Sequence, residues 1–150
     1  MNNKPDYMIY CDGGARGNPG PAAYGFVIYD EQGSKIYEEG RVIGSTTNNV
    51  AEYSAVIAAL KYISDQSVFR HPKSVLRSPS SVIRVFLDSQ LAAMQLSGKW
   101  KIKNEKLRDL YFIIRELEEK IGGKFNYSNI PREQNREADR LVNLALDGKT

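Results

Sequence analysis

Four acidic residues stand in local contexts that suggest chemistry. Asp12 ends an apolar run and opens a glycine-rich turn, and Asp88 ends a second apolar run. Glu52 lies inside an almost wholly apolar helical segment, and Asp139 lies in the first turns of the last expected helix. A carboxylate at a position where a core should be costs free energy unless a cation compensates its charge. If the four side chains converge, they suggest a divalent metal site.

Each acidic residue taken alone also has a simpler structural role. These roles are an Asx turn at Asp12, a capping box of Asn49 with Glu52, a helix N-cap at Asp88, and for Asp139 an interaction with the helix dipole or an ion pair with Arg136 or Arg140. The four roles are independent, and all of them would have to apply at once to remove the metal site. The convergent arrangement is therefore favoured.

The composition indicates one globular domain over residues 1–150. Hydrophobic residues make up 41% and charged residues 26% of the chain, which are ordinary values for a folded domain. We find no apolar stretch long enough to span a bilayer, and the polar N-terminus does not resemble a signal peptide. The single cysteine, Cys11, excludes an internal disulfide. We expect a cytoplasmic monomer, and the net charge of +3 weakly favours a polyanionic partner.

The first part of the chain predicts an antiparallel meander followed by a buried helix. Three expected strands lie at 7–12, 22–30 and 35–43. The glycine- and proline-rich residues 13–21 form a turn between the first two. Polar residues at 47–49 would cap a helix over 50–63, which is apolar on most sides and therefore buried.

The second part alternates strands and helices. Residues 65–81 are rich in serine, proline and basic residues and predict an exposed loop. The expected elements that follow are a strand at 82–87, helices at 89–97 and 104–121, a strand at 125–130 and a helix at 133–146. The order β-β-β-α-β-α-α-β-α predicts an α/β fold with a five-stranded mixed sheet flanked by helices. If strands 7–12 and 82–87 are parallel neighbours, Asp12 and Asp88 emerge at one edge, where open α/β sheets bind ligands.

Short motifs at the four acids together resemble the type 1 ribonuclease H family over essentially the whole chain. They read CDGG at 11–14, RGNPGP at 16–21, TTNNVAE at 46–52, LDSQ at 87–90 and AD at 138–139. The resemblance implies a ribonuclease H-like fold and a metal-dependent endonuclease that cuts the RNA strand of an RNA–DNA hybrid. It also implies that Asp12, Glu52, Asp88 and Asp139 are catalytic and hold two divalent ions, with Asp12 shared by both. Oxygen ligands without histidine or cysteine favour Mg²⁺ or Mn²⁺ over zinc.

The resemblance also implies a set of substrate contacts. The backbone at Gly13 would approach the RNA strand closely, which favours glycine. Residues that match family positions on sugar and base edges are Asn18, Asn48 and Gln90, with Thr47 and Asn49 as further candidates for the backbone. A contact with the ribose 2′-OH is how a protein distinguishes RNA from DNA.

The chain departs from the family pattern in two places. Many members carry a catalytic histidine before the last helix, whereas residues 131–137 contain none, and Arg132 or Glu133 are candidates for part of that role. Larger members also insert a basic protrusion, which is reduced here to residues 98–103. Trp100 stands there among three lysines and could contact phosphate and sugar. Both features are typical of a compact subgroup.

Several alternatives stay open on the sequence alone. The enzyme could also cut double-stranded RNA, or the chain could be the nuclease domain of a reverse transcriptase. A non-catalytic module that only binds hybrid duplexes would be expected to lack one of the four acids, and all four are present. Trp100 could simply cover the neighbouring short helix.

Overall fold

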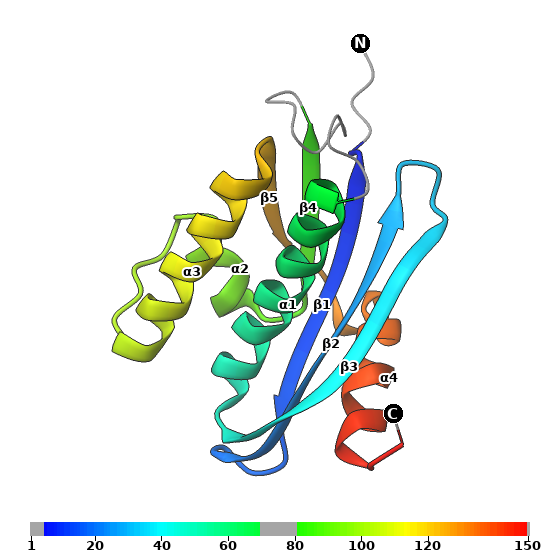
Figure 1. The fold of residues 1–150 in the computed structure, drawn as a ribbon. Helices are drawn as coiled ribbons and strands as arrows, with labels where there is room; N and C mark the ends of the chain where they lie inside the picture. The colour runs from blue at the N-terminus through cyan, green and yellow to red at the C-terminus, as the bar shows by residue number, and fades with distance from the viewer. Residues whose placement is uncertain (1–4, 70–80, 150) are drawn as a thin grey trace.

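A five-stranded mixed sheet forms the centre of the computed structural model, which describes residues 5–69 and 81–149. The strands are β1 (Tyr7–Ala15), β2 (Gly20–Asp30), β3 (Lys35–Thr46), β4 (Val82–Leu87) and β5 (Lys124–Asn129). Their order across the sheet is β3-β2-β1-β4-β5 (Figure 1). β1 is antiparallel to β2 and parallel to β4, and β4 is parallel to β5. The predicted α/β architecture and its mixed sheet are confirmed.

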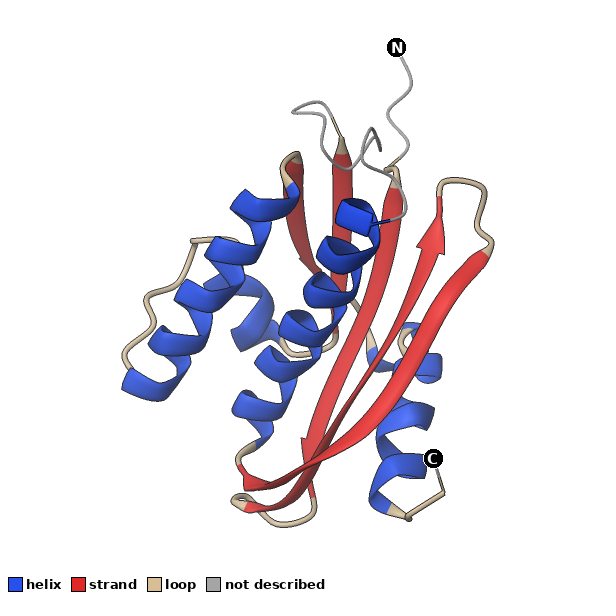
Figure 2. Cartoon of the chain, in the orientation of Figure 1, coloured by secondary structure: helices blue, strands red, loops and turns tan. Residues whose placement is uncertain are grey.

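The helices divide unequally between the two faces of the sheet. They are α1 (Asn48–Phe69), α2 (Gln90–Leu96), α3 (Glu105–Ile121), the 3₁₀ turn η2 (Arg132–Gln134) and α4 (Arg136–Leu146). α1, α2 and α3 share the larger apolar core on one face, and α4 lies against the other face (Figure 2). The smaller core under α4 consists of Ala23, Val142 and Ala145. Such small side chains allow α4 to approach the sheet closely.

β1 is longer than predicted. The strand continues past Asp12 to Ala15, because residues 13–15 pair with residues 22–24 of β2. Glycine and alanine carry no apolar signal of a strand, so the sequence placed them in a turn. The turn is confined to residues 16–19, and Asp12 therefore lies inside the strand rather than at its end.

Two helix boundaries also differ from the prediction. α1 extends to Phe69, so residues 65–69, which were assigned to a loop, are helical. The prediction ended the helix at the last residue of its apolar pattern. The final turn of a helix can be polar, because it need not pack against the core. The rest of that predicted loop, residues 70–80, lies outside the described residues. The last helix is interrupted at Asn135, which separates η2 from α4.

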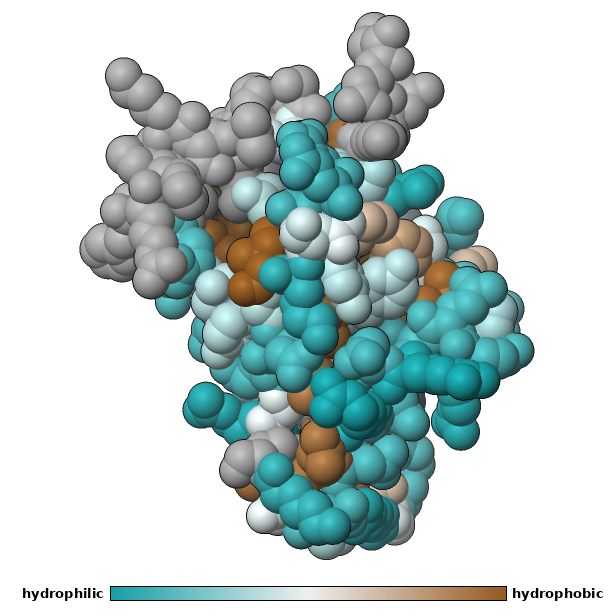
Figure 3. Space-filling view, turned by 90° about the vertical axis from the view of Figure 1, so that its right-hand side faces the viewer, coloured by the Kyte–Doolittle hydropathy of each residue, from teal (hydrophilic) through white to brown (hydrophobic). Residues whose placement is uncertain are grey.

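The side of the molecule next to β3 is mainly hydrophilic, with scattered apolar side chains (Figure 3). Ile36 and Val42 of β3 are among the exposed large apolar residues. Single exposed apolar residues of this kind are normal for a folded protein. Among the residues with described positions, we find no helix that is both long and apolar enough to span a bilayer.

Candidate metal and nucleic-acid site

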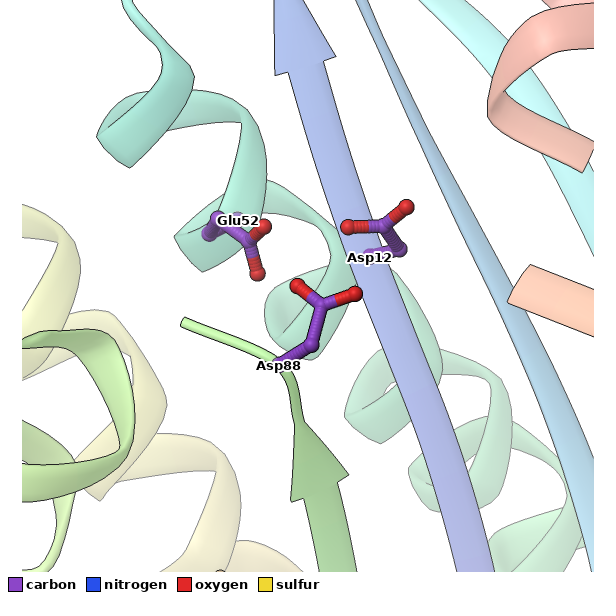
Figure 4. Close-up of side chains that lie close together, drawn as sticks. All are labelled: Asp12, Glu52 and Asp88. Atoms are coloured by element: carbon purple, nitrogen blue, oxygen red, sulfur yellow. The ribbon is translucent and has the colours of Figure 1, made fainter. Parts of the chain in front are cut away.

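Three carboxylates point toward one another beside the carboxyl end of β4, near the middle of the sheet (Figure 4). Asp12, Glu52 and Asp88 each offer an oxygen, and these oxygens lie within 4.8 Å of one another. The parallel ladder of β1 and β4 ends at the pair Cys11 and Leu87. Asp12 follows Cys11 within β1, and Asp88 follows Leu87 directly after the end of β4. The expected meeting of Asp12 and Asp88 is thus observed, and it follows from the strand register.

The position of Glu52 depends on a close contact between α1 and β1. A Cβ atom added to Gly13 would lie 2.2 Å from the carbonyl carbon of Ala51 and 2.4 Å from the backbone nitrogen of Glu52, so only glycine fits. The sequence explained this glycine by an approach of RNA, whereas the contact with α1 is sufficient by itself. Packing at Gly13 brings Glu52 beside Asp12.

A second close contact positions the fourth acid. A Cβ atom added to Gly25 or Gly40 would lie 2.6 Å from a backbone oxygen of α4, that of Ala138 or Leu141. The approach of α4 lets Asp139 line the same cleft as the other three acids. The sequence carried a signal for this contact, because glycine inside a strand often marks the close approach of another backbone.

Burial and mutual repulsion make the charged carboxylates unfavourable. Burial, and next the charge of Asp88, raises the pKa of Asp12 to about 7. Burial and then Asp12 raise the pKa of Glu52 well above its ordinary value, and burial also raises the pKa of Asp88. Within the described part of the chain, Glu52 Oε2 is buried without a hydrogen-bond partner. A bound cation would compensate this arrangement.

Asn135 is a buried residue beside the acids that the sequence did not reveal. Its Nδ2 donates to the carbonyl oxygen of Cys11 at 2.8 Å and has a long contact of 3.5 Å with Asp88 Oδ2. The backbone carbonyl oxygen of Asn135 accepts from the backbone N–H of Asp139 at 3.1 Å. Asn135 therefore ties together the segments that carry three of the four acids. These partners are 124 and 47 residues away for the side chain, so no local pattern indicates them.

Two of the simpler roles belong to neighbouring residues. The N-cap of α2 is Ser89 rather than Asp88, and its Oγ accepts from the backbone N–H three residues later at 3.1 Å. Thr47 caps the first turn of α1 in the same way at 3.2 Å. The capping box of Asn49 with Glu52 is therefore not formed. Asp88 and Glu52 are left to face the cleft.

The alternative ion pair of Asp139 with Arg136 or Arg140 is absent from the contacts of the described residues, although Asp139 does lie in the first turn of α4. Arg140 Nη2 instead lies 3.0 Å from Glu137 Oε2 and 3.4 Å from Glu38 Oε2. Asn143 Nδ2 lies 3.4 Å from Asp139 Oδ2. The Asp139 carboxylate therefore has a neutral neighbour, which leaves its charge available to a cation.

The four acids line a cleft of ≈ 430 Å³ together with four of the other candidate residues. These are Gly13, Asn48, Asn49 and Arg132. Asn48 Oδ1 accepts from the backbone N–H of Ala15 at 2.8 Å, and its own backbone N–H donates to Asn18 Oδ1 at 2.9 Å. The two asparagines thus fasten the turn after β1 to the start of α1. This role is structural, and the sequence did not suggest it.

The other candidate substrate contacts and the second candidate for the histidine role do not line this cleft. Gln90 is exposed at the start of α2. Trp100 lines a separate hollow of ≈ 250 Å³. Glu133 lines a third cavity of ≈ 330 Å³ with Tyr10. Of the two candidates for the absent histidine, only Arg132 therefore faces the acids.

Most of the chain is similar to known proteins. A family profile described as Reverse transcriptase-like matches residues 10–145, a range that includes all four acids. A bifunctional protein of Mycobacterium tuberculosis is 40% identical over 141 residues, or 93% of this chain and 35% of that protein. A ribonuclease HI of Halobacterium salinarum is 41% identical over 140 residues, or 92% of this chain and 63% of that protein. The chain thus spans about a third of the first relative and less than two thirds of the second.

A solved structure is similar along almost its entire length. It is the crystal structure of LC11-RNase H1 in complex with an RNA/DNA hybrid, which is 40% identical with a TM-score of 0.82. The similarity covers 95% of this chain and 97% of that one. The sheet and its helices are therefore arranged alike in both proteins.

Proposed function

The chain belongs to the ribonuclease H family, and we propose that it is a divalent-metal-dependent endonuclease acting on the RNA strand of RNA–DNA hybrids. It would hydrolyse phosphodiester bonds within that strand. The observation that carries the proposal is the meeting of three carboxylates within 4.8 Å in a cleft that Asp139 also lines. The hybrid bound to LC11-RNase H1 supports the choice of substrate.

The residues present suit a divalent metal. The donor atoms are all carboxylate oxygens, and Glu52 Oε2 is buried without a partner among the described residues. Hard oxygen ligands favour Mg²⁺ or Mn²⁺. Asp12, Glu52, Asp88 and Asp139 would hold two such ions, with Asp12 shared. Two bound ions would supply an activated water and stabilise the leaving oxygen of an in-line displacement.

Two arginines line the acidic cleft, and one of them, Arg16, pairs with Asp147 at 2.7 Å. Burial raises the pKa of Asp88 and the charge of the other arginine, Arg132, acts against this larger effect, so its guanidinium interacts with that carboxylate. A guanidinium binds phosphate oxygens through paired N–H groups. We infer that Arg132 contacts the phosphate next to the scissile bond and takes part of the role of the absent histidine.

The substrate surface would extend from the cleft along α2. Gly13 and Asn48 line the cleft and would meet the RNA strand, with Asn18, Thr47 and Gln90 around them. Asn18 and Thr47 would act chiefly by holding the loop and helix that present these groups. Trp100 and its lysines would contact the backbone further along the duplex, where stacking and charge are tolerant of sequence.

A strand-specific cleavage assay tests the proposal. A hybrid labelled on either strand would be compared with matched double-stranded RNA and double-stranded DNA, each with Mg²⁺, Mn²⁺ or EDTA. We expect metal-dependent cutting of the RNA strand of the hybrid. Cutting of double-stranded RNA as well would favour a broader nuclease. Tight hybrid binding without any cutting would instead identify a binding module.

Three further expectations stay predictions. They concern a single domain over residues 1–150, a monomeric state and a cytoplasmic location. The partial coverage of the first curated relatives is compatible with a nuclease domain that works inside longer proteins. Sedimentation of the purified chain measures the monomeric state directly.

A further inference from the structure

A connection without helix or strand joins α2 to α3 (Figure 1). It carries one aromatic and three basic residues. We call residues 98–103 the tryptophan segment, because they include Trp100 between Lys99 and Lys101. Trp100 is 42% exposed, and the three lysines of the segment are exposed as well. The segment adopts no regular secondary structure. A segment of this kind contacts a nucleic acid well only if its shape is set before binding.

Backbone hydrogen bonds set the first half of the tryptophan segment. The N–H groups of Lys99 and Trp100 both donate to the carbonyl oxygen of Met94, at 2.9 and 3.2 Å. The N–H group of Gly98 donates to the carbonyl oxygen of Gln95 at 3.0 Å. These bonds join the segment to the last turn of α2 and end at Trp100.

Three side chains hold the second half: Ile102 packs against the main core, Arg108 Nη2 has a long contact of 3.5 Å with the carbonyl oxygen of Lys103, and Gln95 bonds Lys101. Gln95 Nε2 donates to the carbonyl oxygen of Lys101 at 3.3 Å. Gln95 Oε1 accepts from the hydroxyl group of Tyr53 at 2.6 Å. Gln95 is only 5% exposed and Tyr53 is fully buried. A buried amide is costly unless both of its ends are bonded, so these two contacts select one orientation of the side chain.

The hydrogen bonds of Gln95 connect α1, which carries Glu52, to the tryptophan segment. Tyr53 directly follows Glu52 on α1, so the helix that brings a carboxylate to the cleft also holds Gln95. Gln95 in turn holds the segment that carries Trp100. The path from Glu52 to Lys101 therefore contains one side-chain hydrogen bond on each side of a buried glutamine.

We propose that Gln95 is a positioning residue for hybrid binding, which it promotes by fixing the tryptophan segment to the helix that carries Glu52. The proposal rests on the proposed function. Without Gln95, residues beyond Trp100 would sample more conformations, and binding would have to restrict them. The loss should therefore affect substrate affinity while the chemistry at the acids proceeds unchanged.

Kinetic measurements on Gln95→Leu test this assignment. Leucine retains the volume and removes both hydrogen bonds. We expect KM for the hybrid to rise several-fold while kcat changes by less than about twofold. The same substitution in a Lys101→Ala, Lys103→Ala background should raise KM much less, because the basic side chains of the half that Gln95 holds are gone. Gln32→Leu, which changes an exposed glutamine in the β2–β3 turn, is the matched control and should leave both constants unchanged.

A fluorescence measurement separates this proposal from the proposed function. Trp100 is the only tryptophan, so its emission reports on the segment alone. Gln95→Leu should increase acrylamide quenching of Trp100 without changing the far-ultraviolet circular dichroism, and Tyr53→Phe should give a smaller increase. Quenching equal to the wild type, or an equal rise of KM in the Lys101→Ala, Lys103→Ala background, would overturn the role of Gln95. If the wild type does not cleave hybrids, the proposed function fails, and quenching still decides whether Gln95 fixes the segment.

Discussion

The acidic cleft and the tryptophan segment are held in place by different physical means. At the cleft, the backbones of α1 and α4 touch the sheet at Gly13, Gly25 and Gly40, where no side chain fits. At the tryptophan segment, a few hydrogen bonds from α2 and one buried glutamine hold an exposed strip of chain. The cleft is thus fixed by close backbone packing, whereas the second half of the segment depends in part on side-chain hydrogen bonds that substitutions can remove.

This difference matches what each region has to do. Carboxylates that repel one another must be held rigidly if they are to accept ions in one geometry, because misplacement by about 1 Å can cost around a hundredfold in rate. A surface that contacts the backbone of a duplex tolerates more movement, because charge and stacking depend less on orientation. Substitutions in the cleft should therefore affect rate and stability, and substitutions in the segment should affect affinity.

The largest effect is expected from closing the space at Gly13. In Gly13→Ala the new Cβ would meet the backbone of Ala51, so α1 must move and carry Glu52 away from Asp12. We expect a loss of about 3 kcal/mol in the free energy of unfolding, measured by urea denaturation, together with loss of metal-dependent cleavage. Gly14→Ala is the matched control, since its Cβ would lie 3.7 Å from Val142 Cγ1 in ordinary contact. Equal stability of the two variants would contradict the close-packing account.

The next effect concerns the charge of the cleft without metal. The pKa of Asp12 rises from 3.8 to about 7 in the folded protein, so folding favours the protonated form. The associated stability is present below pH 3.8 and is lost as the pH rises to about 7, at about 1.4 kcal/mol for each pH unit within that window. In EDTA, urea denaturation should therefore show a wild type that weakens from pH 4 to pH 8 more than Asp12→Asn does.

Added metal should reverse this loss at high pH. A cation that binds the folded cleft stabilises it against unfolding. We expect Mg²⁺ to raise the unfolding midpoint of the wild type at pH 8 and to have little effect on Asp12→Asn. If the free energy of unfolding in EDTA changed with pH in the same way for the wild type and for Asp12→Asn, ionisation of the buried Asp12 would not be what destabilises the folded protein at high pH.

A smaller effect is expected from the tryptophan segment. Trp100→Ala removes a stacking surface, which contributes about 1–3 kcal/mol for each base stacked. The hybrid should bind more weakly, with KM raised and kcat little changed, and the free energy of unfolding should stay close to the wild type because Trp100 is half-exposed. Fluorescence anisotropy of a labelled hybrid in EDTA measures the binding. A fall in kcat with KM unchanged would place Trp100 with the chemistry instead.

The smallest effect separates the two candidates for the histidine role. Arg132 lines the acidic cleft, and Glu133 lines the cavity beside Tyr10. We expect Arg132→Ala to lower kcat several-fold through loss of phosphate contact, and Glu133→Ala to leave kcat near that of the wild type. Steady-state cleavage at saturating hybrid compares them. The opposite order would assign the role to Glu133.

Much of the cleft was predictable because its signals are local. Asp12 and Asp88 each follow an apolar run, and the parallel register of those runs brings the two residues together. The order of strands and helices likewise follows from hydrophobic period and turn residues. Element ends were less predictable, because the glycine-rich end of β1 and the polar end of α1 carry no apolar pattern.

The contacts that hold the site were not predictable in the same way. Asn135 and Gln95 look like ordinary polar residues in the chain, and their partners lie far away in sequence. Gly25 and Gly40 indicate that another backbone approaches the sheet closely, but the sequence does not show that this backbone is that of α4. These residues act through tertiary contacts, and the sequence alone does not show which residues they contact.

Cleavage of a strand-labelled RNA–DNA hybrid by the wild type and by Asp12→Asn, side by side, tests the central claim most directly. The claim is that the convergent carboxylates hold the divalent ions that cut the RNA strand. We predict RNA-strand products from the wild type with Mg²⁺ or Mn²⁺, none in EDTA, and none from a folded Asp12→Asn under any of these conditions. Products from Asp12→Asn, or from the wild type in EDTA, would contradict it.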